Sequence, residues 1–164
     1  FDPERIESFV RLLPRDTREG EALAREHDHR LRRGALVRAD EHVRYRHAFE
    51  VRNETYFVPE FYELLRRLRC GYVIADTAGK FGYSEEVTAN FVYVRLHGRD
   101  VLYASGYRDE HLDEWAGRIR GWAAEKRDVY VYFDNDALAH APRDAQSLAA
   151  RVKPYLADAM RMGA

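Results

Sequence analysis

The sequence predicts an α/β fold of the TIM-barrel type, built from parallel strands that alternate with helices. After residue 44, short segments rich in Val, Tyr and Phe alternate with helical patterns of apolar residues, which is typical of a parallel sheet. The strands also have one apolar and one polar face, whereas a doubly wound sheet is apolar on both. In a closed parallel barrel, helices cover the outside and polar side chains gather inside, near the carboxyl ends of the strands.

The composition is that of a globular protein. Of 164 residues, 46% are hydrophobic, and 27 Lys and Arg balance 28 Asp and Glu, which argues against disorder and against a polycationic nucleic-acid arm. No apolar stretch approaches the roughly 18 residues of a membrane span, and no signal peptide opens the chain. We therefore expect a cytoplasmic protein without membrane association. Cys70 is the only cysteine, which excludes an intrachain disulfide and a cysteine-based zinc cluster.

The first 44 residues are more densely charged than the rest. A helix is expected over residues 3–13, with Asp2 as its N-cap and Pro3 at its first position. A second, very polar helix is expected from about residue 17 to 33. We interpret residues 17–44 as a polar helical excursion that precedes the first strand.

Strands and helices alternate from residue 48 onward. The expected strands cover residues 48–52, 72–77, 91–97 and 129–134. The expected helices begin at Pro59, Asp109 and Pro142, and the last is interrupted near Pro154. The connection over residues 78–90 is close to the minimum length of a crossover, so its helix must be very short.

Side-chain alternation along the strands brings charged groups to one end of the sheet. In the strand at 91–97, the polar face comprises Tyr93, Arg95 and His97. The polar residues expected at this mouth are Glu50, Arg52, Asp76, Arg95, His97, Asp134, Asn135 and Asp136. Barrel enzymes keep their active sites at the same place.

Two interpretations of this polar group remain open. In the first, it is a buried ion-pair network in which Glu50 and Asp134 neutralise Arg52 and Arg95, with His97 hydrogen-bonded between them. In the second, which we favour, it is a ligand pocket, because acids, bases and a histidine converge there beyond structural need. The loop that follows the third strand carries further aromatic residues, Tyr103 and Tyr107, which either cover a ligand or only pack under the loop.

Several residue runs resemble a known family. They are Tyr93-Val94-Arg95-Leu96-His97-Gly98, then Tyr103 and Tyr107, residues 112–116 and residues 129–136, with matches at 46–52 and 75–77 upstream. Together these runs resemble the domain of unknown function 72 family (DUF72, YecE-like TIM-barrel proteins). The resemblance implies a TIM-like barrel whose activity is not established. The family often has Asn at the position of Asp134.

Family members carry about half of the barrel before the position of Phe1. The resemblance therefore implies that residues 1–164 are the C-terminal part of a single barrel, with the fifth to eighth strands. Four strands cannot close a barrel, so we expect the N-terminal half or an associated copy to complete it.

The first functional hypothesis is a hydrolase-like or lyase-like enzyme that acts on a phosphate-bearing or sugar-like substrate. Arg52 and Arg95 would hold an anion, and Glu50, His97 and Asp134 would transfer protons. The other expected ligand contacts are Asp76, Tyr103, Tyr107, Asn135 and Asp136. The ligand class is a small molecule or a nucleotide-like compound, and the pattern names no cofactor.

Two alternatives remain. A metal-dependent variant would use His97 with Glu50, Asp76 and Asp134 to hold an oxygen-preferring or zinc-like ion; it is the weaker form of the enzyme hypothesis, and no metal ligand is assigned. The other is a non-catalytic protein that binds nucleic acid through residues 30–38, the mouth arginines and the tyrosines between them. Balanced charge disfavours it.

Overall fold

The computed structural model describes residues 1–31, 34 and 36–162. These residues form two compact units, Phe1–His47 and Ala48–Ala164, which are described separately. Within the part of the chain that is described, no helix has the length and apolar character needed to cross a bilayer.

The first unit contains two short capped helices, α1 (Pro3–Leu12) and α2 (Thr17–Arg25). The side chain of Asp2 accepts a hydrogen bond from the Arg5 N–H, and Asp16 caps α2 by accepting from two N–H groups. Neither helix has a buried residue, as expected for so polar a segment. The prediction that the second helix reaches residue 33 is wrong, because it ends at Arg25, and Leu31 further along is exposed and does not anchor a longer helix. Arg32 and Arg33 of the expected helix, and Ala35 of the expected excursion, lie outside the described residues.

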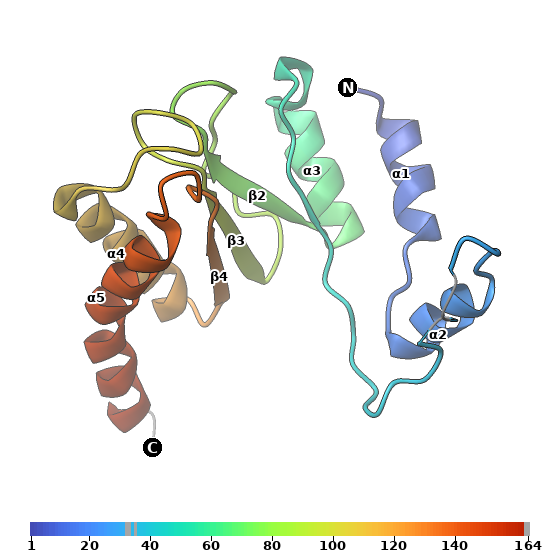
Figure 1. Ribbon diagram of the computed structural model, residues 1–164. Helices are drawn as coiled ribbons and strands as arrows, with labels where there is room; N and C mark the ends of the chain where they lie inside the picture. The colour runs from blue at the N-terminus through green and yellow to red at the C-terminus, as the bar shows by residue number, and fades with distance from the viewer. Residues whose placement is uncertain (32–33, 35, 163–164) are drawn as a thin grey trace. The chain divides into compact units, whose positions relative to one another are not determined.

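The second unit is a four-stranded parallel sheet with helices, and it confirms the predicted α/β fold of TIM-like type. The strands are β1 (Ala48–Phe49), β2 (Gly71–Asp76), β3 (Phe91–Leu96) and β4 (Asp128–Phe133), in the spatial order β1-β2-β3-β4. The helices are the short 3₁₀ helix η1 (Glu54–Tyr56), α3 (Pro59–Leu68), α4 (Asp109–Ala124) and α5 (Ala141–Met162). In Figure 1, α4 and α5 lie side by side against the sheet.

The two faces of this sheet differ as the strand pattern predicts. On the outer face, Ile74, Val94 and Leu96 are 0% exposed, and Leu112, Trp115, Ala116 and Ile119 are the buried residues of α4. On the inner face, Tyr130 and Tyr132 of β4 are 39% and 50% exposed. The core therefore lies between sheet and helices, and the inner face is open in this chain.

Three tyrosines of the inner face form a stack. Tyr93 pairs in register with Tyr130, and its ring lies 5.1 Å from that of Tyr132 at an angle of 17°. The rings of Tyr93 and Tyr130 are 6.3 Å apart at 26°. Side chains of one face meet across neighbouring strands because they alternate with period two.

Three expected boundaries differ from the structure. The first strand pairs over two residues only, Ala48 with Gly71 and Phe49 with Tyr72, and residues 50–52 leave the ladder although β2 continues to Asp76. No helix forms in residues 77–90; instead, the side chain of Thr88 accepts from the Tyr72 N–H at 2.7 Å and donates to the Cys70 carbonyl at 2.8 Å, which secures the irregular crossover. The last helix continues through Pro154, after Leu148 and Val152 have already anchored it in the core.

Candidate functional site

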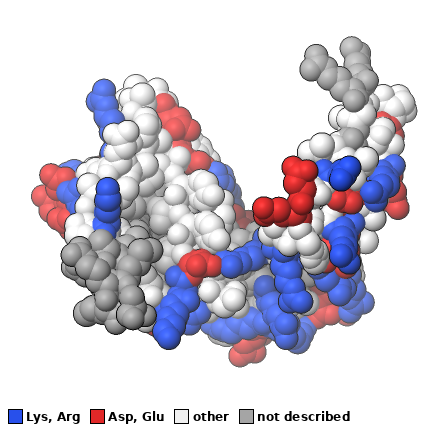
Figure 2. All heavy atoms as spheres, turned by 90° about the horizontal axis from the view of Figure 1, so that it is seen from below, with Lys and Arg blue, Asp and Glu red and all other residues white. Residues whose placement is uncertain are grey.

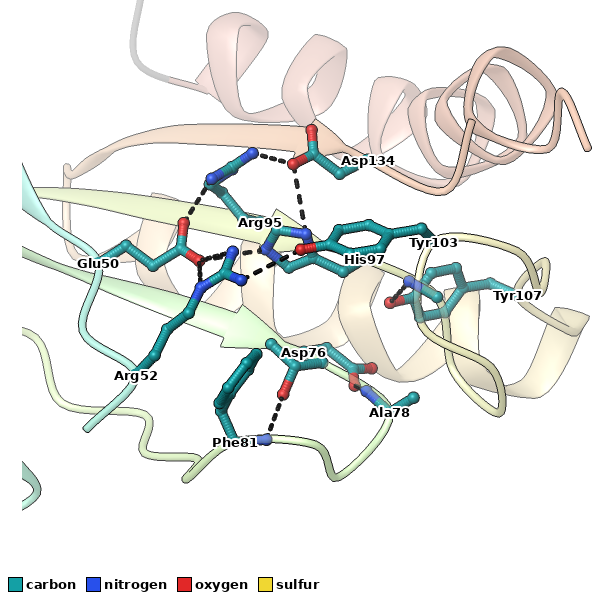
Figure 3. Close-up of polar contacts among 12 residues, drawn as sticks. Glu50, Arg52, Asp76, Ala78, Phe81, Arg95, His97, Tyr103, Tyr107 and Asp134 are labelled. Atoms are coloured by element: carbon teal, nitrogen blue, oxygen red, sulfur yellow. Dashed lines mark hydrogen bonds and ion pairs between the residues drawn. The ribbon is translucent and has the colours of Figure 1, made fainter. Parts of the chain in front are cut away.

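Six side chains meet on the inner face at the carboxyl ends of the strands, and we call them the mouth cluster. They are Glu50, Arg52, Arg95, His97, Tyr103 and Asp134 (Figure 3). Their meeting follows from register: Arg95 pairs with Ala75 in β2 and with Tyr132 in β4, so its side chain points to the inner face with those residues. His97 and Asp134 lie two residues further along their strands and share that face.

Arg95 connects the two carboxylates of the cluster. Its Nη1 atom donates to Oε2 of Glu50 at 2.5 Å, and its Nη2 atom donates to Oδ2 of Asp134. Arg52 adds a second cation, since its Nε and Nη2 atoms lie 3.3 and 3.0 Å from Oε1 of Glu50. Its Nη1 atom donates to the Tyr103 hydroxyl at 3.1 Å. Two guanidinium groups thus balance two carboxylates, as the ion-pair interpretation expects.

His97 lies between these carboxylates and is fully buried. Its Nδ1 atom lies 3.3 Å from Oδ2 of Asp134 and its Nε2 atom 3.4 Å from Oε1 of Glu50, yet neither nitrogen has a hydrogen bond of good geometry. Burial lowers the pKa of His97, and the nearby arginines lower it further against the opposing effect of Glu50. The imidazole is therefore neutral near neutral pH and has one nitrogen free to accept a proton.

Glu50 stays ionised for a different reason. Burial alone would raise its pKa, but the hydrogen bond and charge of Arg95, followed by those of Arg52, lower it below its ordinary value. A neutral histidine beside an ionised carboxylate is a common arrangement for proton transfer.

The loop of residues 98–107 places Tyr103 against His97. Gly98 has a φ of +110°, and a Cβ atom there would lie 2.6 Å from the Val101 carbonyl oxygen, so only glycine fits. Tyr103 itself adopts φ +63°. Its N–H donates to the His97 carbonyl at 2.5 Å, and its ring meets the imidazole edge-on at 5.4 Å.

Tyr107 and Asn135 support this loop through buried hydrogen bonds and are not part of the mouth cluster. Tyr107 is 7% exposed, and its hydroxyl accepts from the Gly98 N–H at 3.2 Å. Asn135 is 0% exposed and donates to the Ser105 carbonyl and to Asp144. Asp136 is exposed and lies outside the cluster. The sequence pattern alone did not separate these residues from the cluster.

The expectation that Asp76 joins the mouth is wrong. Asp76 pairs in register with Leu96, so its side chain points to the outer, helix-covered face. It is 6% exposed there, and it lines a separate cavity with Arg99 and residues of α4. The alternation that groups Asp76 with Tyr72 and Ile74 already carried this signal, because both of those residues are core residues.

Phe81 was not predicted as part of the site. The Cζ atom of Arg52 lies 4.9 Å from the centre of its ring, which supports the guanidinium from one side. Phe81 lies in the irregular crossover, where no periodic pattern marks the direction of a side chain. Among the described residues, no group of three or more His, Cys, Asp or Glu side chains is arranged to hold a metal ion.

Comparison with known proteins gives one family. The family model described as "Protein of unknown function DUF72" matches residues 1–161. A search of curated proteins returned no match.

Solved structures of DUF72 family proteins are also similar to this chain. A DUF72 family protein from Thermotoga maritima is 26% identical, with a TM-score of 0.58 over 68% of this chain and 46% of its own length. A DUF72 family protein from Enterococcus faecalis is 18% identical, with a TM-score of 0.59 over 65% of this chain and 46% of its own length. The chain thus spans about half the length of the solved structures that it matches.

Proposed function

This chain belongs to the DUF72 family of proteins of unknown function, and from that premise we propose that its mouth cluster is part of the active site of an enzyme. The proposed reaction is of the hydrolase or lyase type, on a phosphate-bearing or sugar-like small molecule. The observation that carries the proposal is His97, which is fully buried between two carboxylates without a well-formed hydrogen bond at either nitrogen.

An ion-pair network built only for stability does not need such a histidine. Arg95 alone connects Glu50 and Asp134, and Arg52 already completes the charge balance. A buried imidazole with unsatisfied nitrogens costs free energy, which a structural network avoids. Unsatisfied polar groups of this kind are common where a substrate supplies the missing partner.

Each residue has a proposed role. His97 takes a proton from the substrate or from water, and Asp134, whose side chain is 29% exposed, returns it toward solvent. Glu50 holds the imidazole from the other side through its position near Nε2. Arg52, whose side chain is 41% exposed, is the more accessible of the two cations; it would exchange part of its contact with Glu50 for a phosphate or a sugar hydroxyl, with Tyr103 as a second donor.

The open inner face extends this proposal toward sugars. The stacked rings of Tyr93, Tyr130 and Tyr132 run from the mouth cluster along the sheet. Aromatic faces and hydroxyl groups suit the mixed apolar and polar surface of a sugar ring.

Nucleic-acid binding remains the less supported alternative. The two mouth arginines are engaged by carboxylates, and Arg30 pairs with Asp28 at 3.4 Å. On the face drawn in Figure 2, basic side chains lie among acidic ones. Phosphate backbones are bound by cations that can give up their counterions, and paired arginines are poor at this.

The test compares two aspartates that are two residues apart in the full-length protein. Hydrolysis of nitrophenyl phosphate and of nitrophenyl glycosides is measured for the parent, Asp134→Asn, His97→Gln and Asp136→Asn. We expect the first two variants to lose about 100-fold or more in kcat/KM, as general acid–base groups do, and Asp136→Asn to retain activity. Equal activity of all four proteins would refute the proposal, and so would activity lost only with loss of folding, as judged by circular dichroism.

A further inference from the structure

A second cavity of about 340 Å³ lies on the helix-covered side of the sheet, apart from the mouth cluster. Its polar lining is Asp76 at the end of β2, Arg99 in the following loop, and His111, Glu114 and Arg118 on α4. Its volume is near the lower end of the roughly 300–1,000 Å³ range of small-molecule pockets. The cavity is therefore large enough for a small ligand.

Asp76 presents to this cavity an acceptor without a well-formed hydrogen bond, although the Tyr107 hydroxyl also interacts with its carboxylate. The residue is 6% exposed, and its Oδ1 atom accepts from the Ala78 N–H at 3.3 Å. Its Oδ2 atom is buried and has no hydrogen-bond partner. The Nη1 atom of Arg99 forms an ion pair with it at 3.6 Å, beyond hydrogen-bond distance. Because a buried carboxylate oxygen is costly without a donor, the site favours a ligand that brings one.

His111 presents an unused donor. The Nη2 atom of Arg108 lies 3.2 Å from its Nε2 atom, and a guanidinium can only donate, so Nε2 accepts. In the neutral ring the proton is then on Nδ1, which is buried without a partner. One cavity thus combines an anionic acceptor and a donor that both lack a well-formed hydrogen bond.

We propose that this cavity binds a small zwitterion that carries an ammonium and a carboxylate group, the class to which α-amino acids belong. The ammonium donates to Oδ2 of Asp76, and the carboxylate accepts from Nδ1 of His111 and from Arg99. The charged lining suits such a ligand, because Asp76 and Glu114 balance Arg99 and Arg118.

A phosphate dianion fits the cavity less well. The Nε atom of Arg118 is already taken by both carboxylate oxygens of Glu85, at 3.0 and 3.2 Å. Arg99 would then face two anions, the phosphate and Asp76, while Arg118 is held by Glu85. A ligand with one charge of each sign avoids this repulsion.

The zwitterion site is independent of the proposed enzyme activity. It shares none of the six mouth residues, although Phe81 lines the cavity and also supports Arg52. Its failure and that of the proposed function are therefore separable by experiment.

The test is isothermal titration calorimetry on the full-length protein with four probes: glycine, L-serine, acetate and methylamine. We expect a zwitterion to bind at least about tenfold more tightly than acetate or methylamine, because only it satisfies both groups at once. The proposal is overturned by equal affinity for acetate, or by binding of none of the four.

Two matched variants assign the binding to Asp76. Asp76→Asn keeps the shape and the Ala78 hydrogen bond but removes the charge, and it should weaken binding about 10- to 100-fold, the range for hydrogen bonds to charged groups. Asp100→Asn, an exposed aspartate beside Arg99, should bind as the parent does, and so should Asp134→Asn in the mouth. Without ligand, the melting temperature of Asp76→Asn is measured to check that the variant is folded, since the substitution also removes the ion pair with Arg99. Undiminished binding by a folded Asp76→Asn variant would contradict the assignment.

Discussion

The Nδ1 atom of His97 lies 3.3 Å from the Oδ2 atom of Asp134, although the imidazole is fully buried and the carboxylate is 29% exposed. The two residues follow neighbouring strands, β3 and β4, and the sheet register brings them together. Under the proposed function, this contact would let protons pass between the buried imidazole and the partly solvated carboxylate. The mouth cluster and the loops around it have effects on folding stability and on substrate affinity that can be measured.

Folding stability should fall as the pH decreases through the titration of His97. Its pKa is lowered in the folded state, so below the ordinary value of 6.5 the unfolded chain takes up a proton that the folded chain does not. Urea unfolding measured from mildly alkaline to acidic pH should therefore show decreasing stability below about pH 6.5. His97→Gln should flatten this part of the curve, and an unchanged curve in that variant would assign the decrease to other groups.

Glu50 should make folding stability depend on pH in a second, more acidic range. Its folded-state pKa is lowered below 4.5, so the stability it contributes is present above that value and is lost as the pH falls through the folded pKa. Glu50→Gln should remove this loss in the same urea experiment. If the acidic limbs of Glu50→Gln and parent coincide, the arginines do not stabilise the ionised form of Glu50.

Gly98→Ala should destabilise the loop over the cluster. A methyl group at φ +110° would lie 2.6 Å from the Val101 carbonyl, and we expect a loss of about 1–3 kcal/mol in unfolding free energy. Gly121→Ala is the matched control, because it lies inside α4 with nothing within 4 Å and should stabilise by about 0.5–1 kcal/mol. Equal effects of the two substitutions would contradict the strained conformation at Gly98.

Thr88→Val should weaken the crossover before β3. The hydroxyl satisfies the Tyr72 N–H and the Cys70 carbonyl, and valine has the same shape without either hydrogen bond. Two buried backbone groups left unpaired should cost about 2–4 kcal/mol, measured by urea unfolding. Thr55→Val, on the exposed 3₁₀ helix, serves as a control with an expected loss below about 1 kcal/mol. A loss of that small size in Thr88→Val would mean that water replaces the hydroxyl.

Tyr103→Phe should separate function from folding. The substitution removes the hydroxyl that accepts from Arg52 at 3.1 Å but keeps the ring beside His97. Stability should change by less than about 1 kcal/mol, since the bond is partly exposed. Substrate affinity should fall, seen as a higher KM, because Arg52 loses the contact that holds its orientation. An unchanged KM would restrict Tyr103 to a packing role.

Strand alternation accounts for what could be predicted from the sequence. Because side chains alternate strictly, the placement of Arg95 and His97 on one face required only the limits of the strand at 91–97. The same rule placed Asp76 on the face that carries core residues. Because Asp76 is also the last residue of its strand, we instead expected its side chain at the mouth. Register decides between the two, and register depends on pairing that one strand does not encode.

Most of the features that the sequence did not predict lie in irregular segments. Phe81 and Gly98 owe their positions to turns whose geometry depends on contacts distant in sequence, so no period marks them. Pro154 shows the limit of a local rule: a helix already anchored in the core by Val152 tolerates the one hydrogen bond that proline removes.

The segregation of aromatic residue types gives the second unit two separate optical signals. Both tryptophans of the chain, Trp115 and Trp122, lie on α4 in the helical layer, whereas the stacked rings of Tyr93, Tyr130 and Tyr132 lie on the open face of the sheet. Tryptophan fluorescence therefore reports on the helical layer, and the part of the near-ultraviolet circular dichroism that comes from the stacked tyrosines reports on the open face. A sugar, or a polypeptide segment that packs on that face, would change the second signal and leave the first unchanged, which allows occupancy to be followed without an added label.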